Sequence, residues 1–343
     1  MAGPGLITRT CLGAVLFLAF ASVASATSTS DRALNAALAQ FDEDEHADLR
    51  GVVVLRDGHI VAERYYNGAK ATELNDIRSA GKSVTALLAG IAIDQGRIRS
   101  VDDPVQRYWT EAKGSAIGPV ALRDVLGMRS GLAAFDDDDD SPGNEDRMDE
   151  AADPRAFVLG LANVDPPGTK YRYNSVTAWV AGVVVARATG ETLADFARAA
   201  LFAPLGITNW KWSADRAGYT KGQGNLWMTT RDMATIGAMV LADGIHDGRR
   251  IVSAAWLRDA LAPTVSIADS DPFADSYGYM WYSKRYPVES ESVAVSFASG
   301  NGGNKIYVLP RPGLVVAITS RAYGRGHGQR RSERILKAVL AAQ

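Results

Sequence analysis

Strand-like segments occur near both ends of the chain, and they enclose a long central stretch with the periodicity of helices. Near the N-terminus, residues 51–66 form two strand-prone runs around Asp57-Gly58, a pair that readily adopts the positive φ angles of a hairpin turn. After Pro263 the strand pattern returns, over residues 277–282, 293–297, 305–309 and 314–319. This order predicts an α+β fold, in which one antiparallel sheet is built from both chain ends and is interrupted by a mostly helical insert.

Six segments have apolar residues at helical spacing. They cover residues 31–41, 83–95, 175–189, 192–201, 230–241 and 332–340. Gly96 and Gly190 follow two strongly apolar segments, at the position where a helix commonly ends. The first and last segments should flank the sheet as terminal helices. We therefore expect a discontinuous α/β sheet domain of residues 27–75 and 265–343, a mostly helical domain of residues 76–264, and an active site between the two.

Residues 1–26 have the features of a secretory signal peptide. Arg9 precedes a short apolar run over residues 12–20, and an A-x-A cleavage site ends at Ala26. Because the run is far shorter than the roughly 20 residues that span a bilayer, we expect export to the periplasm or the medium, without a stable membrane anchor after cleavage. Cys11 is the only cysteine, and its removal excludes disulfides and cysteine-ligated metal centres in the mature chain.

Charge and histidine content argue against several classes of partner. A formal net charge of −2 gives the chain no overall electrostatic attraction to nucleic acid. The four histidines are isolated from one another, and the acidic run at 136–140 lacks the glycine and glutamate of a calcium-binding loop. We therefore predict no metal, no cofactor and no nucleic-acid partner, and we interpret the acidic run as a solvated loop.

Ser79 and Lys82 form an S-x-x-K tetrad at the start of the apolar segment 83–95. The spacing of three residues places the hydroxyl and the amine on one face of a helix. The helix N-terminus and partial burial both act to lower the pKa of a lysine in this position. We therefore expect a neutral Lys82 that takes the proton of Ser79 and so activates it as a nucleophile.

A succession of further motifs accompanies the tetrad. They are G-R-I-R-S-V-D-D-P-V at 96–105, L-R-D-V-L-G-M-R-S-G-L at 122–132, P-P-G-T at 166–169, Y-R-Y-N-S at 171–175, P-L-G at 204–206 and T-R-D-M-A at 230–234. In sequence and order these motifs resemble the serine β-lactamase and penicillin-binding protein superfamily, in particular class C β-lactamases and their esterase and 6-aminohexanoate-dimer hydrolase relatives. The resemblance covers about residues 51–319, which is most of the mature chain.

The resemblance implies a division of roles within the site. Ser79 would be the acylated nucleophile and Lys82 its general base, with Tyr173 sharing proton transfer to the leaving group and from the hydrolytic water. The backbone N–H groups of Ser79 and Asn301 would form an oxyanion hole, since backbone donors do not depend on side-chain identity. The residues expected to contact substrate are Ser175, Ser299, Gly300 and Trp227.

The chain departs from the family pattern at two positions. Ser175 stands where many relatives have asparagine, and Ala298 stands where the K-T-G or H-x-G motif of the family has a cation. In relatives that cation commonly helps to bind the carboxylate of a β-lactam or peptide. Both departures favour the esterase and amidase branches over β-lactamases and D,D-peptidases.

These observations together predict an exported serine hydrolase that cleaves an ester or amide of a small molecule through an acyl-enzyme on Ser79. Two alternatives stay open: a β-lactamase or D,D-peptidase, and a non-turnover penicillin-binding or sensor protein that traps the acyl group. The acidic stretch 136–150 falls in a region that commonly overhangs the active site in relatives. In that position its aspartates would disfavour anionic substrates and favour neutral or cationic ones.

Overall fold

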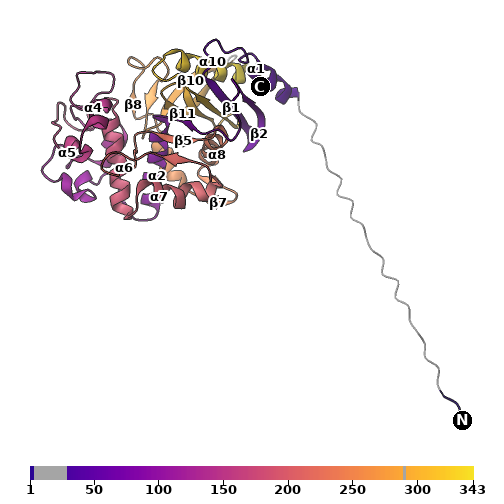
Figure 1. Ribbon diagram of the computed structural model, residues 1–343, viewed down its shortest axis with the longest axis horizontal. Helices are drawn as coiled ribbons and strands as arrows, with labels where there is room; N and C mark the ends of the chain where they lie inside the picture. The colour runs from indigo at the N-terminus through magenta and orange to yellow at the C-terminus, as the bar shows by residue number, and fades with distance from the viewer. Residues whose placement is uncertain (4–28, 289–290) are drawn as a thin grey trace.

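The computed structural model describes residues 1–3, 29–288 and 291–343, and the predicted signal peptide lies almost entirely outside these residues. An eight-stranded antiparallel sheet forms the centre, in the order β2-β1-β13-β12-β11-β10-β9-β8 (Figure 1). Its strands are β1 (Leu49–Arg56), β2 (His59–Tyr65), β8 (Val265–Ser266), β9 (Ser276–Tyr277), β10 (Tyr282–Val288), β11 (Glu291–Gly300), β12 (Asn304–Leu309) and β13 (Leu314–Ser320). The predicted α+β fold, with a sheet built from both chain ends, is confirmed.

The two ends of the chain meet inside the sheet and not at its edges. β1 pairs with β13, with Val53 opposite Ala317, and β12 lies on the far side of β13. The predicted hairpin joins β1 to β2, and its turn residues Asp57 and Gly58 have φ angles of 48° and 82°. Both residue types tolerate this left-handed region, so the turn imposes little strain.

Helices cover both faces of the sheet (Figure 1). The terminal helices α1 (Thr29–Ala39) and α10 (His327–Ala341) pack against each other, and α10 also contacts β12 and β13. From the other side, α8 (Thr230–Leu241) contacts β1, β12 and β13, and α2 (Ala80–Asp94) contacts β11 and β12. Every residue of β12 and β13 is therefore buried, which is typical of a sheet covered on both faces.

The helical part is assembled around α2 and α6 (Ser175–Thr189), which pack against each other and are buried around most of their circumference. At Gly90 a Cβ atom would lie 2.2 Å from the Trp256 ring, so only glycine lets α2 approach α9 (Ala254–Leu261) this closely. The other helices are α3 (Leu122–Leu126), α4 (Glu145–Glu150), α5 (Pro154–Leu159) and α7 (Leu193–Ala197), with the shorter turns η1 (Val105–Arg107), η2 (Thr110–Ala112), η3 (Arg198–Phe202) and η4 (Ala203–Leu205). Short strands form two small sheets, β3 (Asn75–Asp76) with β5 (Leu226–Met228) and β4 (Lys211–Trp212), and β6 (Ile245–His246) with β7 (Arg249–Arg250).

Two predicted elements differ from the structure. The strand predicted over 277–282 is instead the end of β9 and the start of β10, joined by a turn in which the Gly278 N–H donates to the Trp281 carbonyl at 2.8 Å. The helix predicted over 192–201 ends at Ala197 and continues as the wider π-type turn η3. In both places the apolar pattern correctly predicts that the residues are buried, but it predicts the wrong backbone conformation.

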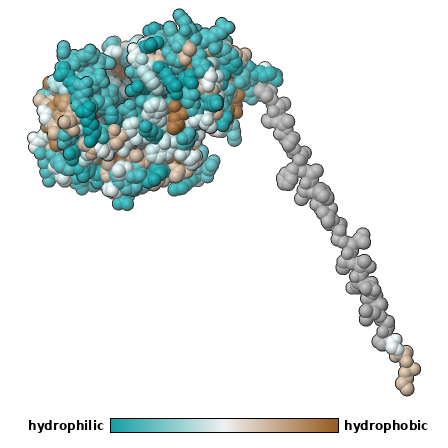
Figure 2. Space-filling view, viewed as in Figure 1, coloured by the Kyte–Doolittle hydropathy of each residue, from teal (hydrophilic) through white to brown (hydrophobic). Residues whose placement is uncertain are grey.

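None of the described helices combines the length and apolar character needed to cross a membrane. The face seen in Figure 2 is mostly hydrophilic, and its apolar residues form small scattered groups. Isolated apolar residues of this kind are common on globular proteins.

Candidate active site

A cleft of about 730 Å³ brings together residues from the sheet and from the helical part. Of the residues predicted for the site, it is lined by Ser79, Tyr173, Ser299, Gly300 and Asn301. The remaining lining residues are Arg78, Phe135, Asp136, Asp137, Asp139, Asn144, Glu145, Asp146, Asp149, Tyr171, Gln223, Gly224, Asn225, Ser270, Asp271, Phe273, Tyr282, Gly302, Lys305, Gly324, Arg325, Gly326 and Gln329. Segments from both halves of the chain therefore form one continuous wall around Ser79.

Ser79 occupies the N-cap position of α2, where a serine hydroxyl usually accepts a bond from a backbone N–H of the first turn. Within the described chain it makes no such capping bond, so the hydroxyl stays available to other groups. The preceding residue, Arg78, has a φ of 52°, which is strained for a side chain of this size. Asp76 offsets that strain by accepting from the Arg78 N–H at 2.9 Å.

Lys82 lies one helical turn after Ser79 and is almost completely buried, with 1% of its surface exposed. Its ammonium donates to Ser79 Oγ at 3.0 Å, to Ser175 Oγ at 2.9 Å and to the Gln223 carbonyl at 2.9 Å. Its three N–H donors therefore each have an acceptor, which is what a buried ammonium requires.

The charge state of Lys82 differs from the sequence-based expectation. Burial acts to lower the pKa of Lys82, but electrostatic interactions with Tyr173, Glu145 and Asp136 outweigh it and raise the pKa above the ordinary value. Lys82 is therefore a cation at neutral pH. The prediction of a neutral lysine was wrong because it took into account only the helix N-terminus and burial. The carboxylates that act on Lys82 are far from it in sequence, so the sequence pattern did not show them.

Tyr173 and Ser175 are held beside Lys82 by the start of α6. Asn174 caps this helix by accepting from the Thr177 N–H at 2.7 Å, and this fixes the two flanking residues. The Tyr173 ring centre lies 5.0 Å from Lys82 Nζ. Ser175 is fully buried and bonded to Lys82, and it is not among the cleft-lining residues, so its side chain positions the lysine rather than contacting substrate.

The end of β11 packs directly against the turn that carries Ser79. A Cβ atom at Gly300 would lie 2.0 Å from the Ile77 carbonyl oxygen and 3.0 Å from the Ala80 nitrogen, so glycine is required at this position. Neither the Ser79 N–H nor the Asn301 N–H donates to a backbone or side-chain group of the residues described. Both donors lie at the cleft, where an oxyanion hole was predicted.

Acidic residues of the 136–149 segment line one wall of the cleft. The Asp136 N–H donates to the Tyr173 carbonyl at 3.0 Å, and Asn144 Nδ2 donates to the Asp136 carbonyl at 3.2 Å, so the segment is fastened beside Tyr173. The acidic wall consists of Asp136, Asp137, Asp139, Glu145, Asp146 and Asp149. Among the described residues, only Asp149 of this wall forms an ion pair, with Lys221. The interpretation of the run as a solvated loop therefore holds for Asp138, Asp139 and Asp140, which are exposed, and is wrong for Asp136 and Asp137, because burial raises the pKa of both carboxyl groups.

Asp136 carries the largest electrostatic penalty of this wall. Neither carboxylate oxygen has a hydrogen-bond partner of ordinary length among the described residues, although the hydroxyl and N–H of Ser175 face it. Burial, with a smaller contribution from the Glu145 carboxylate, raises the pKa of Asp136 to about 6 against the opposing effects of Lys82 and Ser175. Between about pH 4 and pH 6 the folded protein thus holds a proton on Asp136 that an unfolded chain has already lost.

This raised pKa predicts how stability depends on pH. Because the native state binds the proton more tightly, the stabilising contribution of Asp136 is fully present below about pH 4 and is lost as the pH rises through about 6. We expect Asp136→Asn to raise the free energy of unfolding by about 1–2 kcal/mol at pH 7.5 and to change it little at pH 4. Urea unfolding at the two pH values measures this difference. Asp140→Asn, at an exposed position outside the cleft, serves as the control, and an equal effect of both substitutions would contradict the prediction.

A family model described as Beta-lactamase matches residues 34–340. The chain belongs to the beta-lactamase family. A 6-aminohexanoate-dimer hydrolase of Paenarthrobacter ureafaciens is 27% identical over 284 residues, which is 78% of this chain and 71% of the relative. The fold is shared with a family VIII carboxylesterase, with a TM-score of 0.72, 15% identity and coverage of 91% of this chain and 98% of the other. A penicillin-binding protein homologue from Caulobacter crescentus has a TM-score of 0.67, 18% identity and coverage of 92% and 98%. The predicted resemblance is confirmed, and hydrolases of amides and esters are among the relatives.

Gln223 and Lys305 are among the polar residues of this beta-lactamase-family protein that line the cleft without having been predicted. Gln223 is fully buried, and neither atom of its side-chain amide has a partner within the described chain. Lys305 lies on β12 and donates to Ser299 Oγ at 2.7 Å. No local motif marks either position, because each depends on tertiary contacts.

Trp227 does not line the cleft, contrary to the prediction. It lies on β5, where it pairs with Asp76 and Lys211. The residues just before this strand, Gly224 and Asn225, line the cleft instead, because the chain turns away into β5 at Leu226.

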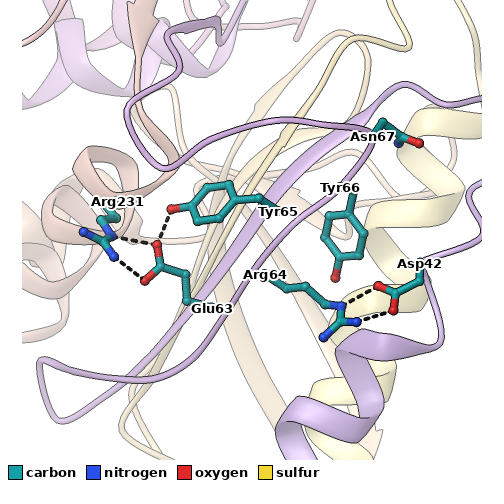
Figure 3. A pocket seen from close by; sticks show the side chains of 7 residues that line it. All are labelled: Asp42, Glu63, Arg64, Tyr65, Tyr66, Asn67 and Arg231. Carbon is teal, nitrogen blue, oxygen red and sulfur yellow. Dashed lines mark hydrogen bonds and ion pairs between the residues drawn. The ribbon is translucent and has the colours of Figure 1, made fainter.

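A second hollow, of about 680 Å³, lies outside the cleft and shares no residue with it (Figure 3). Its charged side chains are paired with each other: Arg231 with Glu63, and Arg64 with Asp42. Because these pairs already satisfy its charges, the hollow offers no unpaired group for catalysis. Across the described ranges, no cluster of three or more His, Cys, Asp or Glu residues is arranged to hold a metal ion.

Proposed function

We propose that the protein is a serine hydrolase that cleaves a small-molecule amide or ester through an acyl-enzyme on Ser79. The observation that carries this proposal is the Lys82 ammonium bonded to Ser79 Oγ at 3.0 Å, with Tyr173 beside it in the same cleft. A hydroxyl held this way, in a cleft that also holds the unused backbone N–H donors of Ser79 and Asn301, supports attack on a carbonyl carbon. We also propose that the protein acts after export.

Lys82 and Tyr173 would move one proton as a unit. Because Lys82 is a cation at rest, it cannot accept the Ser79 proton by itself. In the reacting state Tyr173 would be deprotonated beside the Lys82 ammonium, so that its phenolate oxygen takes the Ser79 proton and passes it to the leaving group. In deacylation the same oxygen would take a proton from the hydrolytic water and return it to Ser79 Oγ. The pH dependence of the rate would then report values that belong to the pair rather than to either residue.

The acidic wall favours an acyl group that is neutral or positively charged. Its unpaired carboxylates create a negative potential that repels an anionic acyl chain and attracts an ammonium. The 27% identical relative is named for a substrate of this chemistry, the dimer of 6-aminohexanoate. We therefore propose short linear amides or esters with an ammonium on the acyl half as the substrate class. The unpartnered amide of Gln223 is available to bond the acyl chain.

The test follows acylation by intact-protein mass against release of p-nitrophenolate. The substrates are p-nitrophenyl esters of 6-aminohexanoate, hexanoate and adipate, which place a cation, a methyl group or a carboxylate at the end of the acyl chain. We expect a transient adduct on the Ser79 peptide, many turnovers, and rates that fall in that order. Ser79→Ala should show no adduct.

Each alternative function has its own outcome in this experiment. A stable adduct with a single turnover would favour the acyl-trapping sensor. Faster reaction with nitrocefin or a D-alanyl-D-alanine peptide than with any of the esters would favour a β-lactamase or peptidase. An adduct that persists in Ser79→Ala would show that another residue is the nucleophile.

A further inference from the structure

Lys305 reaches the cleft from the strand next to the one that carries the third family motif. In the register of β11 and β12, Ser299 lies directly opposite Lys305. Residues opposite each other in an antiparallel pair project on the same face, so the two side chains meet, with the ammonium donating to Ser299 Oγ at 2.7 Å. Ser299 precedes Gly300, which contacts the Ser79 turn. Lys305 is therefore placed beside the reacting centre.

The Lys305 ammonium is buried without a counter-ion. Only 2% of the residue is exposed, and Nζ lies 4.8 Å from the centre of the Phe297 ring and 5.9 Å from that of Tyr307. Within residues 29–288 and 291–343, no carboxylate forms an ion pair with it, and the Ser299 hydroxyl is the one acceptor for its three N–H groups. A buried cation with two unmatched donors is costly, so this position favours an added anion.

The surroundings of Lys305 bring its pKa close to neutral pH. Burial lowers the pKa of Lys305 to about 7. Asp271 and Glu333 act to raise this pKa and Lys284 to lower it, and Glu333 is itself paired with Lys284 and Lys337. An anion bound at this position would favour the charged form of the lysine and so hold the proton on it.

The charge of the cleft is divided between its two sides. The helical side carries the acidic wall together with Arg78, whose charge is paired with Asp76. The sheet side carries Lys305 and, at its rim, the exposed Arg325, which forms no ion pair within the described chain. Asp271 is the one carboxylate of the sheet side that lines the cleft. A ligand that spans the cleft thus meets negative charge at one end and positive charge at the other.

We infer that Lys305 and Ser299 bind a carboxylate on the leaving half of the substrate. The inference rests on the proposed function and deepens it, because a substrate with an ammonium at the acyl end and a carboxylate at the leaving end is a linear zwitterion. Lys305 then supplies, from β12, the cation that Ala298 does not supply on β11. It is a specificity-determining residue and takes no part in bond cleavage.

The test compares two amides that differ only at the leaving end. One is 6-aminohexanoyl-6-aminohexanoate, and the other is the same molecule ending in a carboxamide. At pH 6.5 we expect the wild-type protein to prefer the carboxylate by about 10- to 100-fold in kcat/KM, the range of a charged hydrogen bond. Lys305→Met should bring this ratio close to one, and the control Lys113→Met, at an exposed lysine outside the cleft that does not act on the pKa of Lys305, should keep it. A ratio near one in the wild type, or a high ratio that survives in Lys305→Met, would overturn the inference.

A second measurement needs no variant. It measures the inhibition of p-nitrophenyl hexanoate hydrolysis by 6-aminohexanoate and by 6-aminohexanamide. The carboxylate should inhibit more strongly at pH 6, and its advantage should fade as the pH rises through about 7 and Lys305 loses its charge. Equal inhibition by the two compounds at pH 6 would overturn the inference even if Lys305→Met fails to fold. An adduct of hexanoate on Ser79 together with equal inhibition would refute this inference alone, whereas the absence of that adduct would refute the proposed function.

Discussion

Methionine in place of Lys82 is expected to lower kcat/KM by about 10⁴-fold, and the same substitution in a Ser79→Ala background is expected to lower it no further. In the proposed mechanism Ser79, Lys82 and Tyr173 act on one proton, and residues that act as a unit give strongly non-additive losses. Methionine matches the length of the lysine side chain but offers no N–H to Ser79, Ser175 or the Gln223 carbonyl. The measurement is the kcat/KM of the wild type, both single variants and the double variant on one ester substrate.

Two controls separate this catalytic effect from a folding defect. Thermal unfolding should show Lys82→Met folded, because removing a buried charge offsets part of the cost of three lost hydrogen bonds. Lys284→Met removes a partly buried lysine that pairs with Glu333, both outside the cleft, and its kcat should stay within about threefold of the wild type. A double variant about 10⁴-fold slower than Ser79→Ala alone would mean that the two residues act independently.

Alanine at Gly300 is expected to reduce both activity and stability. The added Cβ would meet the Ile77 carbonyl oxygen at 2.0 Å, so the end of β11 must move away from the turn that carries Ser79. This movement separates the Asn301 N–H from the Ser79 N–H. Losing one oxyanion donor costs about 10²–10³-fold in kcat, and overpacking costs about 1–3 kcal/mol of stability.

Gly81→Ala is the matched control for this substitution. Gly81 lies equally near Ser79, but its Cβ would approach Gly224 Cα only to 3.4 Å, which is an ordinary contact. Alanine also favours the helix, so activity and melting temperature should be kept or improved. Measurements of kcat and Tm for the two alanine variants test this prediction. Native kcat in Gly300→Ala would mean that this packing does not position the oxyanion hole.

Local patterns predicted much of the architecture. The Asp57-Gly58 turn, the apolar segments 175–189 and 230–241 and the strands over 293–297, 305–309 and 314–319 appear in the structure, because each is specified by residues adjacent in sequence. The prediction of a strand over 277–282 was wrong. A run of aromatic residues indicates that a segment is buried, but a buried segment can be either a strand or a tight turn. Spacing also placed Ser79 within hydrogen-bonding distance of Lys82, because that contact stays within one helical turn.

The electrostatics of the site could not be predicted in the same way. Asp136 and Glu145 raise the pKa of Lys82, but they reach it only after the 136–149 segment is fastened to the Tyr173 carbonyl. Lys305 replaces a missing cation through strand register, and the turn after Gly300 sets that register. Tertiary contacts of this kind leave no signal in a single sequence.

The pairing of β1 with β13 also determines when the protein can fold. Val53 finds its partner only at Ala317, so the sheet has no centre until almost all of the strand-forming residues have been synthesised. Contacts between residues so distant in sequence form slowly, and they leave the β1–β2 hairpin with an open edge in the meantime. During translation the sheet therefore cannot close, and the cleft around Ser79 assembles only after the last strands have been synthesised.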